Sequence, residues 1–334
     1  MQEKRVLLIA PSFFGYYKEI IKELEKKKYT VDYVCDAPSN SNVLKAFGRI
    51  NKKIIGFFTK KYFNKNIWPN IKDKKYEYVI LICGMTYSLF PSMIELIKKN
   101  NNNARFILYQ WDSSKNLSYL TEIKEYFDNL YSFDRQDCID DKRYKFLPLF
   151  YIDSYKNIGS RNENSFKYDC SYVGTAHPKK YKEINEISQK IKDKMPNQYI
   201  YHYMPSNLKF IYHKIFAPEY KKAKITEFQK EKLSTDELMK VFKESRCILD
   251  APQFGQTGLT IRTIECLGAK KKIITSNKDI INYDFYNESN VLIYDGKIDY
   301  NSKFFNEGYK ELNDEIYMKY SLTSWIDEIL KGDC

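Results

Sequence analysis

Short apolar runs separated by amphipathic stretches fill the first 150 residues of the chain. The runs have the length and composition of strands and lie at 5–10, 30–35, 78–83, 105–110, 130–133 and 146–149. Between them, residues 17–27 and 93–99 have the pattern of helices. Strands that alternate with helices in this way form a parallel sheet with helices on both faces. The alternation therefore predicts an α/β fold.

The same alternation begins again after a polar stretch, residues 155–167, which we expect to be a flexible linker. The strands expected beyond it lie at 169–173, 199–203, 226–229, 247–252, 273–275 and 291–294, and the helices at 178–194, 207–216, 234–245 and 315–331. A length of 334 residues also suggests two domains. Ligands of such sheets bind outside the C-terminal ends of the strands, so the cleft between the domains is the expected site.

Composition excludes several other classes of protein. Hydrophobic residues make up 43% of the chain and charged residues 29%, which is typical of a globular protein with a large core. No apolar run reaches the roughly 18 residues needed to cross a bilayer, and the N-terminus lacks the pattern of a signal peptide. The seven cysteines have no C-x-x-C spacing, so we expect buried, reduced thiols and a cytoplasmic protein.

The most informative motif is the segment 255–268, which lies between two apolar runs in the order strand, glycine loop, helix, strand. Such a loop places free backbone N–H groups at a helix N-terminus, where anions are favoured. Arg262 and Glu265 are three residues apart and share one helical face. A guanidinium suits a diphosphate and a carboxylate suits ribose hydroxyls, so the pair indicates a nucleotide site. An ion pair on an ordinary surface helix gives the same pattern.

A second candidate for anion binding follows the strand expected at 169–173. Gly174 and Thr175 end that strand, and Pro178 suits the first position of a helix. Lys179 and Lys180 then fall in the first turn, where the helix dipole disfavours cations. A bound anion would offset this cost. Solvated lysines in a lysine-rich chain explain the pattern equally well.

Two further candidate site residues follow strands of the first domain. Asp112 follows Trp111, which could desolvate its carboxyl group and raise its pKa toward the range of a general base. Asp112 could instead cap the next helix. Gly15 follows the first strand and would allow a ligand to approach the backbone closely, beside Tyr16. Tyr16 could equally be a core residue, and a single glycine is not a dinucleotide fingerprint.

Positive charge is concentrated in residues 43–75, which contain ten basic side chains and one acid in a chain of formal net charge +12. On a helical wheel the apolar side chains of this segment fall opposite the basic ones. The residues expected to contact a membrane are Lys45, Arg49, Lys52, Lys53, Phe57 and Phe58. The pattern favours an interfacial helix on anionic lipid, at the inner face of the plasma membrane. A helix that packs its apolar face on its own domain is the alternative, and no nucleic-acid motif accompanies the charge.

The three histidines have no metal-ligand spacing with one another or with cysteine, so the sequence predicts no metal site.

These motifs together resemble the GT-B glycosyltransferases. The resemblance is to the group 1-like branch of bacterial capsule and lipopolysaccharide gene clusters, related to the spore-maturation CgeB-type proteins. It rests on 109–113, 171–175 and 255–265 and covers nearly the whole chain. It implies an acceptor-side Rossmann-like domain at 1–157, a nucleotide-sugar-binding one at 166–313, and a closing helix within 314–334 that crosses back to the first domain.

The resemblance also assigns roles to individual residues. Glu265 matches the family carboxylate that holds the donor ribose, and the positions of Gly258, Leu259 and Arg262 match the diphosphate site, with Gly174 and Thr175 on its other side. Many retaining members have a further glutamate eight residues before this carboxylate, where this chain has Thr257. The departure favours inversion with a carboxylate base, for which we choose Asp112.

The resulting hypothesis is a metal-independent glycosyltransferase without a bound cofactor. Its expected co-substrate is a UDP-linked nucleotide sugar, with galactofuranose as a candidate sugar, and its expected acceptor is a surface polysaccharide or a lipid-linked glycan. The competing hypothesis is a non-catalytic basic protein that binds a membrane or nucleic acid through residues 43–75.

Overall fold

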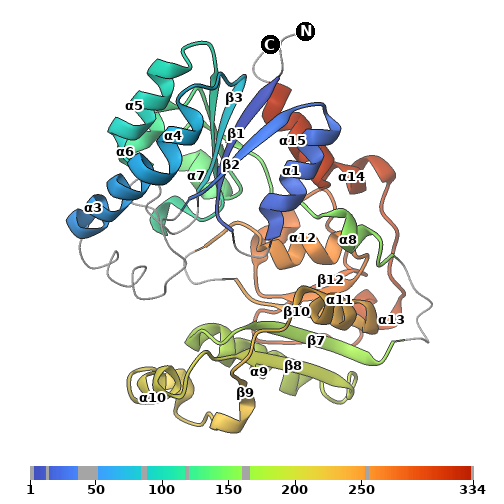
Figure 1. The fold of residues 1–334 in the computed structure, drawn as a ribbon. Helices are drawn as coiled ribbons and strands as arrows, with labels where there is room; N and C mark the ends of the chain where they lie inside the picture. The colour runs from blue at the N-terminus through green and yellow to red at the C-terminus, as the bar shows by residue number, and fades with distance from the viewer. Residues whose placement is uncertain are drawn as a thin grey trace. The chain divides into compact units, whose positions relative to one another are not determined.

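The chain divides into two compact units. Unit 1 is Met1–Pro148 with Leu322–Cys334, and unit 2 is Leu149–Ser321. The computed structural model describes residues 4–12, 15–36, 52–83, 89–116, 120–159, 166–252 and 256–331 (Figure 1).

Unit 1 contains a six-stranded parallel sheet with the order β2-β1-β3-β4-β5-β6. The strands are β1 (Arg5–Ala10), β2 (Thr30–Cys35), β3 (Tyr78–Cys83), β4 (Arg105–Gln110), β5 (Asn129–Ser132) and β6 (Tyr144–Phe146). The helices are α1 (Tyr16–Lys26), α3 (Lys52–Tyr62), α4 (Trp68–Ile71), α5 (Pro91–Asn100), α6 (Leu120–Ile123), α7 (Arg135–Asp140) and α15 (Leu322–Lys331). Because the central strands are covered on both faces, nearly every residue of β1, β3 and β4 is buried.

Unit 2 contains a second six-stranded parallel sheet, with the order β12-β11-β10-β7-β8-β9. Its strands are β7 (Tyr168–Thr175), β8 (Gln198–Tyr203), β9 (Phe228–Gln229), β10 (Ser245–Asp250), β11 (Lys272–Thr275) and β12 (Val291–Ile293). Its helices are α8 (Asp153–Lys156), α9 (Pro178–Ile191), α10 (Asn207–Phe216), α11 (Thr235–Glu244), α12 (Ile261–Gly268), α13 (Lys303–Asn306) and α14 (Asp314–Lys319). A capping box begins α11, with Ser234 and Glu237 exchanging hydrogen bonds.

Each sheet has one point where the strand order reverses. In unit 1 the chain passes from β1 to β2 on one side and to β3 on the other, so the reversal lies between β1 and β3. In unit 2 it lies between β7 and β10. Ligands of parallel sheets bind at the C-terminal strand ends beside such a reversal. In unit 2 these ends carry Thr175 and Asp250.

The closing segment is not the single helix 315–331 that the periodicity predicted. It forms α14 and α15, separated by Tyr320 and Ser321. Tyr151 explains part of the break, since its backbone N–H donates to the carbonyl of Tyr320 and its hydroxyl to that of Tyr317. These bonds hold the end of α14 within unit 2.

α15 belongs to unit 1 and packs against α1. The hydroxyl of Thr323 donates to Glu23 at 2.9 Å, and Lys27 pairs with Asp327. Trp325 is buried edge-on against Tyr109 of β4, with ring centroids 4.8 Å apart. The C-terminal helix is therefore a full part of the core of unit 1.

The expected flexible linker 155–167 is wrong at its beginning. Residues 153–156 form α8, and the ring of Tyr155 is buried edge-on against Phe242 at 5.2 Å. Tyr155 packs this segment against unit 2, and the polar composition of the segment gave no sign of it. Residues 160–165 lie outside the described part of the chain.

The second half of the basic segment packs on unit 1. Phe63, Ile67 and Ile71 are buried in its core, while Phe57 in α3 is 67% exposed. Lys45 and Arg49 lie outside the described residues, and of Lys52, Lys53 and Phe58 only the backbone within α3 is described. The predicted membrane contact of this segment stays a prediction. In the described part of the chain, no helix is long and apolar enough to cross a membrane.

Candidate functional site

The start of α12 is fixed at the C-terminal end of β10 by a buried carboxylate. Asp250 is the last residue of β10, and its Oδ2 accepts hydrogen bonds from the hydroxyls of Thr260 and Thr263. Thr260 is also the N-cap of α12 and accepts from the backbone N–H of Thr263. These bonds tie the first turn of the helix to the strand, so its N-terminus lies at the reversal point of the sheet.

The loop before α12 is held by an asparagine from the neighbouring strand end. Asn277 follows β11, and its amide donates to the backbone carbonyls of Thr257 at 3.0 Å and Gly258 at 3.2 Å. Leu259 is buried, with 2% of its surface exposed, and Gly258 is buried as well. Gly255 lies outside the described residues.

Arg262 and Glu265 form an ion pair within α12, with Nη1 and Oε2 2.7 Å apart. The pair is not on the surface, because only 18% of the arginine side chain and 4% of the glutamate side chain are exposed. The guanidinium lies over the ring of Phe242 at 5.0 Å. Tyr155 lies beside Glu265, and its pKa is raised by burial, by the negative charge of Glu265 and by hydrogen bonding to that carboxylate. The two candidate nucleotide residues therefore lie together in an aromatic enclosure.

Gly174 and Thr175 end β7, the strand next to β10. Gly174 has a packing reason to be glycine, because a Cβ there would lie 2.4 Å from the hydroxyl oxygen of Tyr172. Tyr172 is buried, and its pKa is raised by burial and then by the charge of Asp250, partly offset by Arg262. The strand end and the start of α12 are therefore neighbours around Tyr172.

The predicted start of α9 is confirmed. The helix begins at Pro178, after His177 as N-cap, and Lys180 is half-buried in its first turn.

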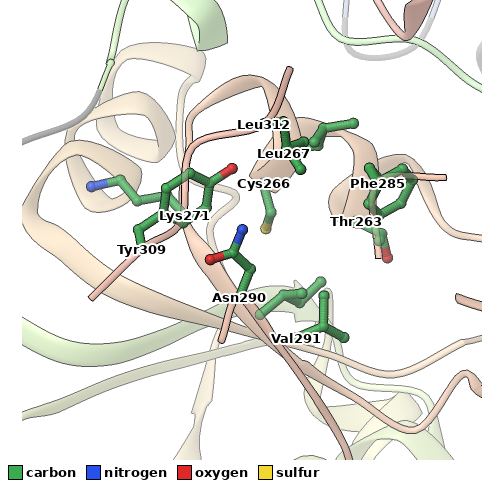
Figure 2. A pocket seen from close by; sticks show the side chains of 10 residues that line it. Thr263, Cys266, Leu267, Lys271, Phe285, Asn290, Val291, Tyr309 and Leu312 are labelled. Carbon is green, nitrogen blue, oxygen red and sulfur yellow. The ribbon is translucent and has the colours of Figure 1, made fainter. Parts of the chain in front are cut away.

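The rear of α12 closes a small cavity of about 20 Å³ (Figure 2). Thr263, Cys266 and Leu267 line it from the helix, and Phe285 and Tyr309 line it from the other side. This volume holds about one water molecule and is far too small for a nucleotide. This cavity is therefore not a nucleotide site.

In unit 1 the structure brings three of the predicted residues to the same end of the sheet. Gly15 is the N-cap of α1 with φ +72°, a left-handed conformation that favours glycine. Tyr16 is buried and its ring lies 5.7 Å from that of Trp111. Asp112 follows Trp111 and is partly exposed, and its carboxylate accepts from the backbone N–H of Ser113 at 2.9 Å. Asp112 is thus hydrogen-bonded to the next residue and remains partly exposed to solvent.

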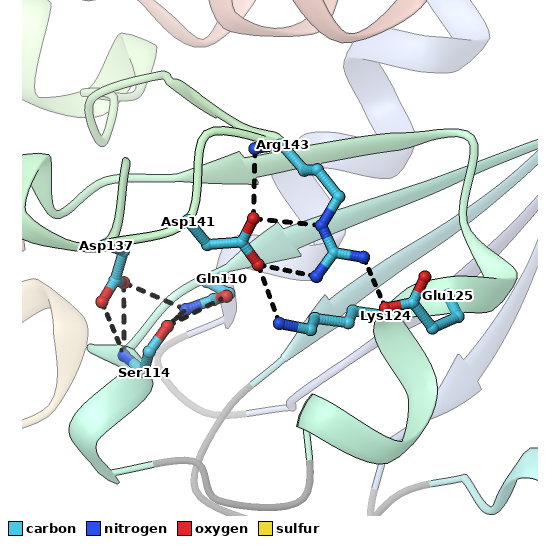
Figure 3. Close-up of polar contacts among 7 residues, drawn as sticks. All are labelled: Gln110, Ser114, Lys124, Glu125, Asp137, Asp141 and Arg143. Carbon is cyan, nitrogen blue, oxygen red and sulfur yellow. Dashed lines mark hydrogen bonds and ion pairs between the residues drawn. The ribbon is translucent and has the colours of Figure 1, made fainter. Parts of the chain in front are cut away.

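Sequence reasoning missed the residue that orders the loop of Asp112. Asp137 in α7 is buried and accepts hydrogen bonds from the Gln110 side chain at 3.0 Å and from the backbone N–H of Ser114 at 3.1 Å (Figure 3). It also accepts a hydrogen bond from the hydroxyl of Ser132 at 2.7 Å. Burial raises its pKa, and the hydrogen bonds from Ser132 and Ser114 oppose the shift. Gln110 and Ser114 flank the turn that carries Asp112, so Asp137 holds both ends of it.

Asp250, Asn277 and Tyr155 were missed for the same reason as Asp137. Asn277 contacts Thr257 and Gly258, which lie on another strand-to-helix loop, and Asp250 contacts Thr260 and Thr263 across the glycine loop. No local pattern in the sequence marks such contacts. Among the described residues, no group of three or more His, Cys, Asp or Glu side chains is arranged to hold a metal ion.

Comparison with known proteins relates the chain to others by fold. No family model matches it, and no curated protein is similar to it in sequence. Solved structures with a similar fold include a glycosyltransferase from Rickettsia africae, with a TM-score of 0.59 and 12% identity over 100% of both chains. HepE from Anabaena, solved with UDP and glucose, has a TM-score of 0.57 and 8% identity over 99% of this chain and 100% of its own.

A third similar structure is the lipopolysaccharide outer core galactosyltransferase WaaB, with a TM-score of 0.54 and 11% identity over 98% of this chain and 99% of its own. These identities are low, so the likeness is one of fold. Two six-stranded parallel sheets with flanking helices, matched over nearly the whole length of such proteins, give this chain the GT-B fold.

Proposed function

We propose that the chain is a glycosyltransferase that takes its sugar from a UDP-linked donor. The observation that carries the proposal is the start of α12, fixed by Asp250 and Asn277 at the reversal point of the second sheet in a GT-B fold. A helix N-terminus fixed in this position attracts a diphosphate through its backbone N–H groups and its dipole.

The donor diphosphate contacts the backbone at Gly258 and Leu259 and the guanidinium of Arg262. Gly174 and Thr175 contact it from the end of β7, and Lys180 adds a positive charge from the first turn of α9. Arg262 suits this role because its guanidinium is pre-oriented by Glu265 and by the face of Phe242.

Glu265 holds the donor ribose. Only 4% of its side chain is exposed and Tyr155 lies beside it, so we propose that the Tyr155 hydroxyl competes with the ribose hydroxyls for the carboxylate. Substituting Tyr155 by Phe removes the competing hydroxyl and keeps the ring. We therefore expect Tyr155→Phe to bind UDP as tightly as wild type or up to about tenfold more tightly, a gain of at most the roughly 1.4 kcal/mol that one hydrogen bond contributes.

Asp112 is the base of an inverting transfer, with Gly15 and Tyr16 on the acceptor side. Asp112 removes the proton of an acceptor hydroxyl, and the acceptor oxygen forms a bond to the anomeric carbon. The bond between that carbon and the UDP oxygen breaks, and UDP leaves with the electron pair. Backbone N–H groups of α12 and Arg262 stabilise the charge on the departing diphosphate, so the step requires no metal ion.

The acceptor in this proposal is a surface polysaccharide or a lipid-linked glycan, and galactofuranose is one candidate sugar. The similarity to WaaB, whose name describes a lipopolysaccharide galactosyltransferase, supports this class of acceptor.

Thermal unfolding with and without nucleotides tests the donor assignment. We expect UDP to raise the midpoint of the wild-type protein and to have a much smaller effect on Arg262→Ala. Lys303→Ala, which removes a cation that is 62% exposed on α13, is the matched control and should respond like wild type. Stabilisation by an oligonucleotide and not by UDP, ADP or GDP would refute the proposal.

A further inference from the structure

The outer face of α10 is the largest concentration of exposed apolar side chains in the described part of the chain. Of the twelve large hydrophobic residues that are exposed there, five belong to this ten-residue helix. They are Leu208 (79% exposed), Ile211 (49%), Tyr212 (59%), Ile215 (68%) and Phe216 (69%). Scattered apolar residues need no explanation, but a contiguous group of this kind marks an interaction surface.

The five side chains form one stripe along the helix. At about 100° per residue, they span roughly 140° of its circumference. Phe210 lies opposite the stripe and is buried. Its ring centroid lies 5.4 Å from that of Phe228 and 6.2 Å from that of Tyr220. The helix is thus held to unit 2 by its inner side, and β9, which Phe228 begins, is the edge strand of the sheet (Figure 1). The exposed stripe lies on the opposite side of the helix.

Basic side chains flank the stripe. On the same helical wheel, Lys209 falls about 20° beyond one edge of the stripe and Lys214 about 60° beyond the other. Lys214 donates to the backbone carbonyls of Lys221 and Ala223, which ties the following turn to the helix. That turn carries three more exposed lysines, Lys221, Lys222 and Lys224. Between residues 205 and 226, five lysines are accompanied by a single acid, Glu219.

We propose that α10 is a membrane-docking helix, which inserts its outer apolar stripe among the head groups of an anionic lipid bilayer while the lysines pair with lipid phosphates. An apolar face bordered by lysines is the chemistry of interfacial helices. A two-fold contact between two copies through this stripe is less favourable, because it would bring two sets of lysines together. The surface is distinct from residues 43–75, which belong to unit 1.

Vesicle binding by the full chain, measured without any nucleotide, tests this inference independently of the proposed activity. We expect the protein to co-sediment with vesicles of phosphatidylcholine and phosphatidylglycerol. The double variant Ile211→Asp/Ile215→Asp should bind at least about 100-fold more weakly, since it removes two of the inserted side chains. Ile281→Asp, at an isoleucine that is 55% exposed outside α10, is the matched control and should bind like wild type.

Neutral vesicles and added salt test the contribution of the lysines to vesicle binding. Binding should be much weaker to pure phosphatidylcholine and should fall as salt is raised. Because the substituted side chains are exposed, both variants should keep the wild-type unfolding midpoint, which excludes misfolding as the cause of lost binding.

Three results would overturn the inference. They are the absence of wild-type binding to anionic vesicles, equal binding by the wild type and the double variant, and a wild-type dimer in sedimentation velocity that the double variant abolishes. The last would make the stripe an interface between copies of the chain.

Discussion

The carboxylate of Glu265 lies 2.7 Å from the guanidinium of Arg262, one helical turn earlier in α12, and both side chains are largely enclosed. Two opposite charges in such a place depend on each other, because removing either one leaves the other poorly solvated. In a nucleotide site the same pairing has a second effect. It fixes the direction in which the guanidinium points before a ligand arrives.

Breaking this ion pair should cost stability. We expect Arg262→Ala to lower the free energy of unfolding by about 3 kcal/mol, because it leaves the enclosed Glu265 carboxylate without its cation. Arg262→Met/Glu265→Gln should lose less than Arg262→Ala, since no charge is left unpaired. Urea unfolding of the two variants measures this. Equal losses in both would show that the pair acts only through packing.

The fixed start of α12 should depend on Asp250. In Asp250→Ala the hydroxyls of Thr260 and Thr263 lose their acceptor, which should cost about 2 kcal/mol and lower UDP affinity about tenfold. Asp250→Asn keeps one acceptor oxygen and should lie between Asp250→Ala and wild type in both measurements. Titration calorimetry with UDP checks the affinity. If Asp250→Ala bound UDP with wild-type affinity, the fixed start of α12 would not be required for donor binding.

The buried histidine of unit 2, His202, should make the stability of the protein depend on pH. Burial lowers the pKa of His202 from 6.5 to about 4, so between these values the unfolded chain binds more protons than the folded one. Stability should therefore fall as pH decreases from 6.5 to 4, by up to about 3 kcal/mol from this residue. His202→Phe should remove this part of the pH dependence, which urea unfolding across the pH range measures. Parallel curves for the two proteins would contradict the assignment.

Asp137 should act on catalysis through the position of Asp112. Asp137→Ala releases Gln110 and Ser114, which flank the turn of Asp112, so turnover should fall about tenfold or more while UDP binding stays at the wild-type level. Asp137→Asn, which keeps one acceptor, should restore part of kcat. A rise in KM with unchanged kcat would instead indicate a role in binding the acceptor.

Much of this fold could be predicted from the sequence because its strands are buried on both faces. Continuous apolar runs such as Tyr78–Cys83 and Arg105–Gln110 gave strand bounds that agree with the structure. The bounds of β6 shifted from 146–149 to Tyr144–Phe146, since a short edge strand has a weak pattern. The break between α14 and α15 was missed because the hydrogen bonds of Tyr151 come from residues far away in sequence.

The candidate site was less predictable than the fold. Spacing alone indicated that Arg262 and Glu265 share a helical face, and the structure confirms the contact. The sequence spacing could not show that Tyr155 lies beside Glu265 or that Asn277 holds the loop before α12, because both contacts join distant parts of the chain. The roles of Asp112 and of the donor residues stay predictions.

Release of UDP from a panel of UDP-sugars, followed by mass spectrometry with a glycan acceptor present, tests the central claim most directly. We expect the wild-type chain and Lys303→Ala to release UDP from at least one member of the panel, with EDTA present or absent. We expect Arg262→Ala and Asp112→Asn to be at least about 100-fold slower, and Asp112→Asn to bind UDP still. Wild-type turnover in Asp112→Asn would remove Asp112 from its role as base, and wild-type turnover in Arg262→Ala would contradict the donor site at α12.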